Sequence, residues 1–170
     1  MNQIENFISK GDNVIPIMSF NARNINSRFG KADDFAEEIE RITGNKIIST
    51  IQDAEPIGPK NLTDVLVVLP CTGNTLAKLN MGIYDTPVTL AVKSHLRNQK
   101  PVVIGVSTND ALSNTAKNIG ALLNYKHYYF IPMSQDDSIK KPFSIVCDFE
   151  RAYETVEYAL TGKQIEPIMF

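Results

Sequence analysis

The sequence predicts an α/β fold, and two observations support that fold class. Segments with helical periodicity alternate along the chain with short apolar runs of strand length. Two of these runs, 64–70 and 101–106, are apolar on both faces, as expected for parallel strands that helices cover on each side. Right-handed crossovers would join such strands. The expected architecture has three layers, is Rossmann-like or flavodoxin-like, and is built on a mostly parallel sheet.

Composition favours a single domain over residues 1–170. The net charge of −2 lacks the excess of Lys and Arg that a nucleic-acid surface needs. Two cysteines without a CxxC motif argue against a disulfide scaffold or a zinc ribbon, so no metal site is expected. No apolar run approaches the ~18 residues of a membrane span, and the N-terminus is polar rather than a signal peptide. We therefore expect a cytoplasmic protein that binds neither nucleic acid nor membranes.

The first part of the chain is predicted to run from a helix into a strand at 14–18 and a polar loop at 21–31. The apolar face of this helix consists of Ile4, Phe7 and Ile8. Asp34 and Glu37 then stand at capping-box spacing before a second helix, which Gly44 is placed to end. A short strand is predicted at 47–51.

The rest of the chain continues the alternation. Thr86 and Pro87 are typical of a helix start, and a helix follows them before the strand at 101–106. A helix at 112–123, a strand at 128–131 and a last helix at 149–160 complete the pattern.

Ligands of open parallel sheets lie beyond the carboxyl ends of the strands, which here are the loops after Met18, Pro70, Val106 and Ile131. The loop after Pro70 carries Thr72, Gly73, Asn74 and Thr75 from a buried strand into a helix. Backbone N–H groups and threonine hydroxyls at a helix N-terminus suit a phosphate or a carboxylate. Alternatively, Thr72 or Asn74 merely caps the helix, and the pattern leaves both interpretations open.

The next strand ends in a similar loop of Ser107, Thr108, Asn109 and Asp110. Taken alone, Asp110 is better interpreted as a helix cap than as a ligand-binding residue. Two polar loops at neighbouring strand ends nevertheless carry more weight together than separately.

Other reactive side chains have simpler structural explanations. Cys71 is better explained as a small residue in a tight turn than as a nucleophile, because no histidine is near it in sequence. His95 and His127 are expected in the core or on the surface rather than as catalytic bases. Arg23 and Arg28 lie in a polar loop. They could bind a dicarboxylate through bidentate hydrogen bonds, although arginines in loops are more commonly solvated. Catalytic residues therefore stay unknown.

Several blocks of sequence resemble a known family. These blocks are SRFGKADDF at 27–35, EPIGPKNL at 55–62, TGNTLAKL at 72–79, LRNQKPVVIGVSTNDAL at 96–112 and YFIPMSQDD at 129–137. They resemble the B subunits of dipicolinate synthase, which are flavoproteins related to the FMN-dependent cysteine decarboxylases. The blocks cover most of the chain in the order found in that family.

The resemblance implies a role in forming dipicolinate during sporulation, in the mother-cell cytoplasm of a spore-forming bacterium. The family oxidises dihydrodipicolinate, or its hydroxy-tetrahydro precursor, together with a dehydrogenase-like A subunit on which NADPH is expected. A small dicarboxylate substrate and a homo-oligomer are implied as well. The residues carried over as FMN contacts, at the phosphate or its neighbourhood and along the adjacent wall, are Thr72, Gly73, Asn74, Thr75, Ser107, Thr108 and Asn109.

Family members begin with a strand and a Gly/Ser loop that helps to hold the flavin phosphate. Here a helix leads directly into the predicted strand at 14–18, which resembles the second half of a βαβ unit. We therefore expect the first strand to be absent from this chain and the flavin site to lack one wall. Two alternatives stay open: a stand-alone FMN-dependent decarboxylase, and a non-catalytic partner subunit with a vestigial flavin pocket.

Overall fold

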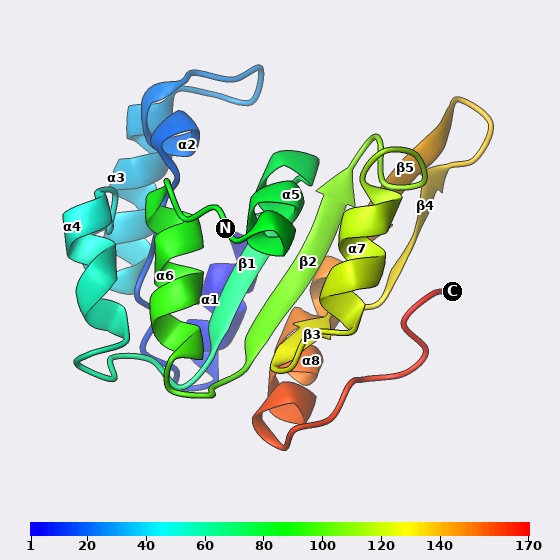
Figure 1. The fold of residues 1–170 in the computed structure, drawn as a ribbon. Helices are drawn as coiled ribbons and strands as arrows, with labels where there is room; N and C mark the ends of the chain where they lie inside the picture. Colours follow the sequence, from blue (N-terminus) through cyan, green and yellow to red (C-terminus); the bar gives the residue numbers. More distant parts are fainter.

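A computed structural model describes the whole chain, residues 1–170, and its centre is a five-stranded sheet (Figure 1). The strands are β1 (Leu66–Cys71), β2 (Val102–Thr108), β3 (Tyr128–Phe130), β4 (Met133–Asp137) and β5 (Lys141–Cys147). β2 pairs in parallel with β1 and β3, and its last residues pair antiparallel with β5, which in turn pairs antiparallel with β4. No strand pairs with the other edge of β1.

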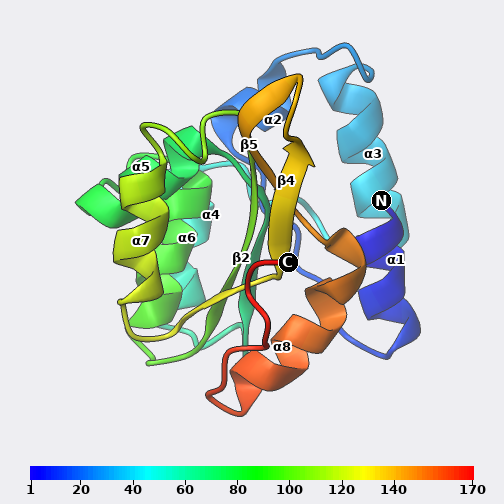
Figure 2. The same cartoon turned by 90° about the vertical axis from the view of Figure 1, so that its right-hand side faces the viewer.

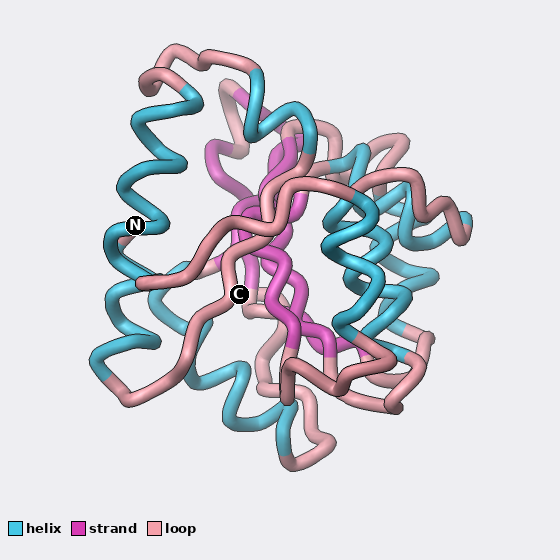
Figure 3. Tube along the Cα trace, turned by 90° about the vertical axis from the view of Figure 1, so that its left-hand side faces the viewer, coloured by secondary structure: helices cyan, strands magenta, loops and turns pink.

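Helices form a layer on each face of the sheet. They are α1 (Asn2–Ser9), α2 (Phe20–Asn24), α3 (Ala32–Thr43), α4 (Ile51–Ala54), α5 (Gly73–Met81), α6 (Pro87–Leu96), α7 (Ala116–Leu123) and α8 (Ala152–Leu160), with short 3₁₀ turns at Glu55–Ile57 and Phe149–Arg151. Figure 2 shows α4, α5, α6 and α7 on one face and α1, α3 and α8 on the other, and Figure 3 shows helices flanking the strands from the opposite side. The predicted α/β class is confirmed, with a mixed sheet that is mostly parallel.

The strand predicted at 14–18 is wrong, as is the one at 47–51. These segments share a single parallel bridge between Ile17 and Ile48. Pro16 has no N–H to extend the ladder toward Lys46. Thr50 ends the other segment because its Oγ1 accepts from Asp53 N at 3.1 Å and so caps α4.

Two further predictions differ in detail. The loop predicted at 21–31 contains the short helix α2, whose N-terminus Ser19 caps. The Asp34 capping box is wrong because α3 already begins at Ala32, whose N–H donates to Asn26 Oδ1 at 2.9 Å. Gly44 does end α3, in the left-handed conformation expected of a C-terminal glycine.

The C-terminal part of the sheet was not predicted. β4 and β5 form an antiparallel hairpin that extends away from the helices (Figure 1). Their sequences, MSQDD and KPFSIVC, carry too many polar residues to show the apolar run of a buried strand. The hairpin makes the sheet mixed.

The register of β1 and β2 positions the candidate site. Val68 pairs with Ile104 and Cys71 with Val106, so the two strands end at the same edge of the sheet. The loops that follow them, into α5 and toward α7, therefore start side by side. The central residues of β2 are fully buried, which fixes this edge to a rigid core.

Candidate functional site

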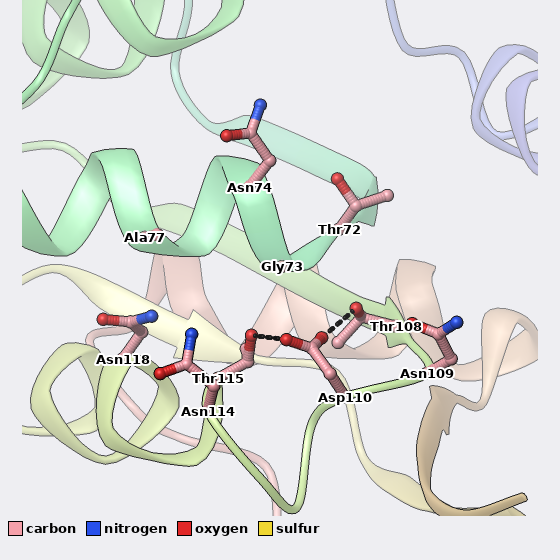
Figure 4. Close-up of a pocket in the computed structure, with 10 residues that line it drawn as sticks. All are labelled: Thr72, Gly73, Asn74, Ala77, Thr108, Asn109, Asp110, Asn114, Thr115 and Asn118. Carbon is pink, nitrogen blue, oxygen red and sulfur yellow. Dashed lines mark hydrogen bonds between the residues drawn. The ribbon is translucent and has the colours of Figure 1, made fainter.

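The loops after β1 and β2 enclose a cleft of about 440 Å³ between the first turn of α5 and the start of α7 (Figure 4). Ten residues line it: Thr72, Gly73, Asn74, Ala77, Thr108, Asn109, Asp110, Asn114, Thr115 and Asn118. Ala77 is the one hydrophobic residue among them, and Asp110 is the one with an ionisable side chain. The cleft is therefore a hydrogen-bonding site with a single charge.

Most of the residues predicted from the two strand ends lie together in this cleft. Thr72, Gly73 and Asn74 line it from the start of α5, and Thr108 and Asn109 line it from the end of β2 and the loop that follows. Thr75 and Ser107 are not among the lining residues. Ser107 lies within β2, where it pairs with Val146 of β5.

Asp110 is held by two threonine hydroxyls. Thr108 Oγ1 donates to its Oδ1 at 2.7 Å, and Thr115 Oγ1 donates to its Oδ2 at 2.7 Å. These bonds, first that of Thr108 and then that of Thr115, lower the pKa of the Asp110 carboxyl below its usual value. The group is therefore ionised at neutral pH. The helix-cap interpretation of Asp110 is wrong, because its carboxylate accepts hydroxyls and α7 begins only at Ala116.

Gly73 lies directly against this carboxylate. A Cβ at position 73 would come within 2.9 Å of Asp110 Oδ1 and of Thr115 Oγ1. The first turn of α5 contains no acidic residue of its own. Asp110 therefore supplies the negative charge that lies beside the positive end of this helix dipole. Thr72 occupies the N-cap position, but its side chain makes no capping bond, so its hydroxyl is free.

Asn118 is the most buried polar residue of the cleft after Thr115, with 3% of its surface exposed. Its Oδ1 accepts from Asn80 Nδ2 at 2.9 Å, and Asn80 Oδ1 accepts from the Tyr125 hydroxyl at 3.1 Å. Sequence reasoning missed Asn118, Asn114 and Thr115. The sequence carried no helical signal for Asn114 and Thr115, since both precede α7, which begins at Ala116.

The remaining candidates lie outside the cleft. Cys71 is fully buried, and burial raises the pKa of its thiol, which excludes a thiolate nucleophile. His95 is also fully buried, and the core was one of the two places predicted for it. Arg23 forms an ion pair with Asp33, whereas Arg28 stacks on the ring of Phe29. Neither arginine lines the cleft.

No group of three or more His, Cys, Asp or Glu side chains is placed to hold a metal ion. None of the helices combines the length and the apolar character needed to cross a bilayer.

Comparison with known proteins identifies the family. The chain matches the Flavoprotein family over residues 2–158. It belongs to this family. The B subunit of dipicolinate synthase from Bacillus subtilis (strain 168) is 42% identical over 167 residues, which cover 98% of this chain and 84% of that protein.

Solved structures agree with this assignment. The crystal structure of the dipicolinate synthase B subunit from Bacillus halodurans C superposes with a TM-score of 0.91 at 38% identity, covering 99% of this chain and 87% of that one. An FMN-dependent cysteine decarboxylase shares the fold with a TM-score of 0.57 at 21% identity, covering 88% of this chain and 98% of that one. The chain is thus a homologue of the dipicolinate synthase B subunits within the Flavoprotein family.

The cleft fits the polar parts of a flavin. Gly73 lets α5 approach the Asp110 carboxylate closely, and the amides and hydroxyls that line the cleft suit the hydroxyls and the ring edge of such a ligand. The ten lining residues provide no broad apolar wall for the flat faces of the ring. That wall would have to come from other residues.

Proposed function

We propose that this protein is the B subunit of a dipicolinate synthase, acting in the mother-cell cytoplasm during sporulation. Its partner would be a dehydrogenase-like A subunit. The reaction would remove a hydride and a proton from dihydrodipicolinate, formed directly or from its hydroxy-tetrahydro precursor, to give the aromatic dicarboxylate. Oxidised nicotinamide on the A subunit would accept the hydride and become NADPH. The observation that carries this proposal is the 42% identity to a B subunit over nearly the whole chain.

We further propose that FMN binds at the strand-end loops. Thr72, Gly73, Asn74, Thr108 and Asn109 would contact it, since all five line one cleft at the carboxyl edge of the sheet. When bound, the flavin would supply a two-electron carrier. The lack of an apolar wall in the cleft supports a homo-oligomer in which a second copy covers the ring.

A non-catalytic role is the second candidate, because one feature of the cleft favours it. Its only ionisable side chain, Asp110, is engaged by two hydroxyls and kept ionised, which makes it a poor proton donor. In this case the chain would stabilise or position the A subunit without taking part in the chemistry.

Co-expression separates the two candidates. Dipicolinate would be measured in cells that express the A subunit alone, with this chain, or with this chain carrying Asn74→Ala. Output that depends on the chain and falls with the variant supports a working site. Output that depends on the chain but ignores the variant supports the positioning role, and output unchanged without the chain rejects both.

Flavin binding is tested directly on the purified protein. Absorbance in the visible flavin band, or quenching of FMN fluorescence during titration, is the expected result. Asn74→Ala should weaken FMN by one hydrogen bond to a charged group, about 1.5–3 kcal/mol. No flavin signal before or after the addition of FMN would reject the flavin proposal and leave the positioning role standing.

A further inference from the structure

The edge of the sheet opposite β1 is formed by β3 and then by β4. Along an edge strand, residues that bond to the neighbouring strand alternate with residues whose N–H and C=O point outward. Ile131 N donates to β2, which leaves Phe130 facing outward. Pro132 O accepts from Asp148 N just after β5, which leaves Met133 facing outward. Outward-facing backbone groups of this kind are a template on which another strand can pair.

A C-terminal strap, residues 164–170, covers this edge. Figure 2 shows it in red, rising from the end of α8 to the base of β4. The Gln164 side chain takes the place of a strand there, because its Oε1 accepts from Phe130 N at 2.7 Å and its Nε2 donates to Phe130 O at 2.7 Å. A side-chain amide offers the same donor and acceptor as a peptide group. Ile165, which follows, is 1% exposed and anchors the strap.

The end of the strap pairs with β4 through its backbone. Met133 N donates to Ile168 O at 2.8 Å, and Met133 O accepts from Phe170 N at 3.3 Å. The side chains of Met169 and Phe170 are 55% and 64% exposed, so these two residues bury little apolar surface. The contribution of this end of the strap is therefore the pairing of its backbone with the sheet edge.

We propose that the strap is an autoinhibitory edge strand, which prevents β4 from pairing with β4 of a second copy of this chain. A strand edge is complementary to itself, since two copies can pair antiparallel about a twofold axis. In that arrangement Met133 exchanges its strap partners for the backbone of the second copy. Gln135, which the alternation also directs outward, gains partners there. The inference goes beyond the proposed function, because it involves neither flavin nor the A subunit.

Truncation after Glu166 tests this role. It removes residues 167–170 and keeps both Gln164 bonds and the buried Ile165, so the strap retains its anchor. We expect the truncated protein to sediment at about twice the molar mass of the full chain, at concentrations where the full chain keeps its own mass. A folded truncated protein, as judged by circular dichroism, with the mass of the full chain would overturn the proposal.

Gln164→Leu covers the case in which the truncated chain does not fold. Leucine keeps the length of the chain and removes both bonds to Phe130, which weakens the attachment of the strap. We expect self-association to strengthen by about tenfold or more relative to the full chain, measured by sedimentation over a range of concentrations. No increase would overturn the proposal.

The matched control carries Met169→Ser together with Phe170→Ser. These substitutions remove the exposed apolar side chains and keep the backbone N–H that donates to Met133. This variant should keep the mass of the full chain. Association as strong as that of the truncated protein would mean that the side chains, rather than the backbone pairing, keep the copies apart, and would overturn the proposal.

Amide hydrogen exchange locates the contact in the associated protein. If β4 pairs with β4, the Gln135 amide should exchange more slowly in the truncated protein than in the full chain, because it gains a partner. Association that leaves this amide unchanged would place the contact on another surface and overturn the proposal. Since none of these measurements uses flavin or the A subunit, failure of the proposed function would not alter their outcome.

Discussion

The two ends of the β1–β2 pair carry two polar clusters that differ in one respect. At the amino ends, Ser94 Oγ donates to Glu55 O at 2.6 Å and accepts from Gly58 N at 2.9 Å. His95 Nε2 donates to Pro101 O at 3.0 Å, since a carbonyl can only accept, so Nδ1 accepts from the Thr63 hydroxyl at 2.8 Å. Every one of these groups has its partner within the chain.

At the carboxyl ends the cluster is open. Asn118 keeps a free donor, Asp110 keeps acceptor capacity, and the Thr72 hydroxyl makes no capping bond. A closed network of buried polar groups holds elements together, whereas an open one is available to a ligand. The contrast predicts that substitutions at the closed cluster reduce stability and that substitutions at the open cluster reduce binding.

Gly58→Ala should have the largest effect, because it breaks the closed cluster sterically. A Cβ at residue 58 would lie 2.0 Å from the carbonyl oxygen of Ser94, which is backbone and cannot rotate away. We expect the free energy of unfolding to fall by about 3 kcal/mol or more, measured by urea denaturation.

Gly120→Ala is the matched control. Gly120 lies in α7, and the space that an alanine Cβ would enter is free of other atoms within 4 Å, so alanine there should stabilise the protein by about 0.5–1 kcal/mol. If both variants had similar stability, the tight contact between Gly58 and α6 would be disproved.

Ser94→Ala should have the next largest effect. It leaves the buried Gly58 N–H and the partly buried Glu55 carbonyl without their partner, which costs about 1–3 kcal/mol of unfolding free energy. Ser113→Ala removes an exposed hydroxyl that donates to Asp110 O, and should change stability by less than about 0.5 kcal/mol. Equal losses in the two variants would contradict the distinction between closed and exposed hydroxyls.

The sequence was informative where local chemistry sets the structure. Thr86 and Pro87 mark the start of α6 through a capping box with Thr89, and the continuous apolar runs become the central strands. The strand at 14–18 could not be recognised as wrong, because the effect of Pro16 depends on which edge its missing N–H faces. The hydrogen bonds of Thr108 and Thr115 to Asp110 could not be predicted either, because they depend on the conformation of the turn between β2 and α7, which sequence spacing does not define.

A change of pH should have a moderate effect on the free energy of unfolding through His95, which belongs to the closed cluster. Burial, the largest cause, lowers the pKa of His95, while the Pro101 carbonyl opposes the shift. The unfolded chain therefore takes up a proton near pH 6.5 that the folded protein takes up only at lower pH, so stability is present above pH 6.5 and is lost as the pH falls.

The slope should not exceed about 1.4 kcal/mol per pH unit, measured by urea denaturation between about pH 7.5 and 5.5. His95→Gln should be less stable at pH 7.5 and should lose part of this slope. His127→Gln serves as the control and should keep it. A slope that persists in His95→Gln and disappears in His127→Gln would contradict the assignment to His95.

The smallest effect on stability is expected from Asn118→Leu, although this residue is as deeply buried as Ser94. Leucine keeps the volume and removes a donor that has no partner in the chain, and the half-buried Asn80 can turn to water. We expect the free energy of unfolding to change by less than about 1 kcal/mol, while FMN affinity falls about tenfold, measured by fluorescence titration.

The control is Asn124→Ala. Asn124 directly follows α7, and its exposed side-chain amide donates to Gly120 O, so its removal should leave the affinity unchanged. A large loss of stability in Asn118→Leu with unchanged affinity would show that the carboxyl-end cluster is structural, like the cluster at the amino ends.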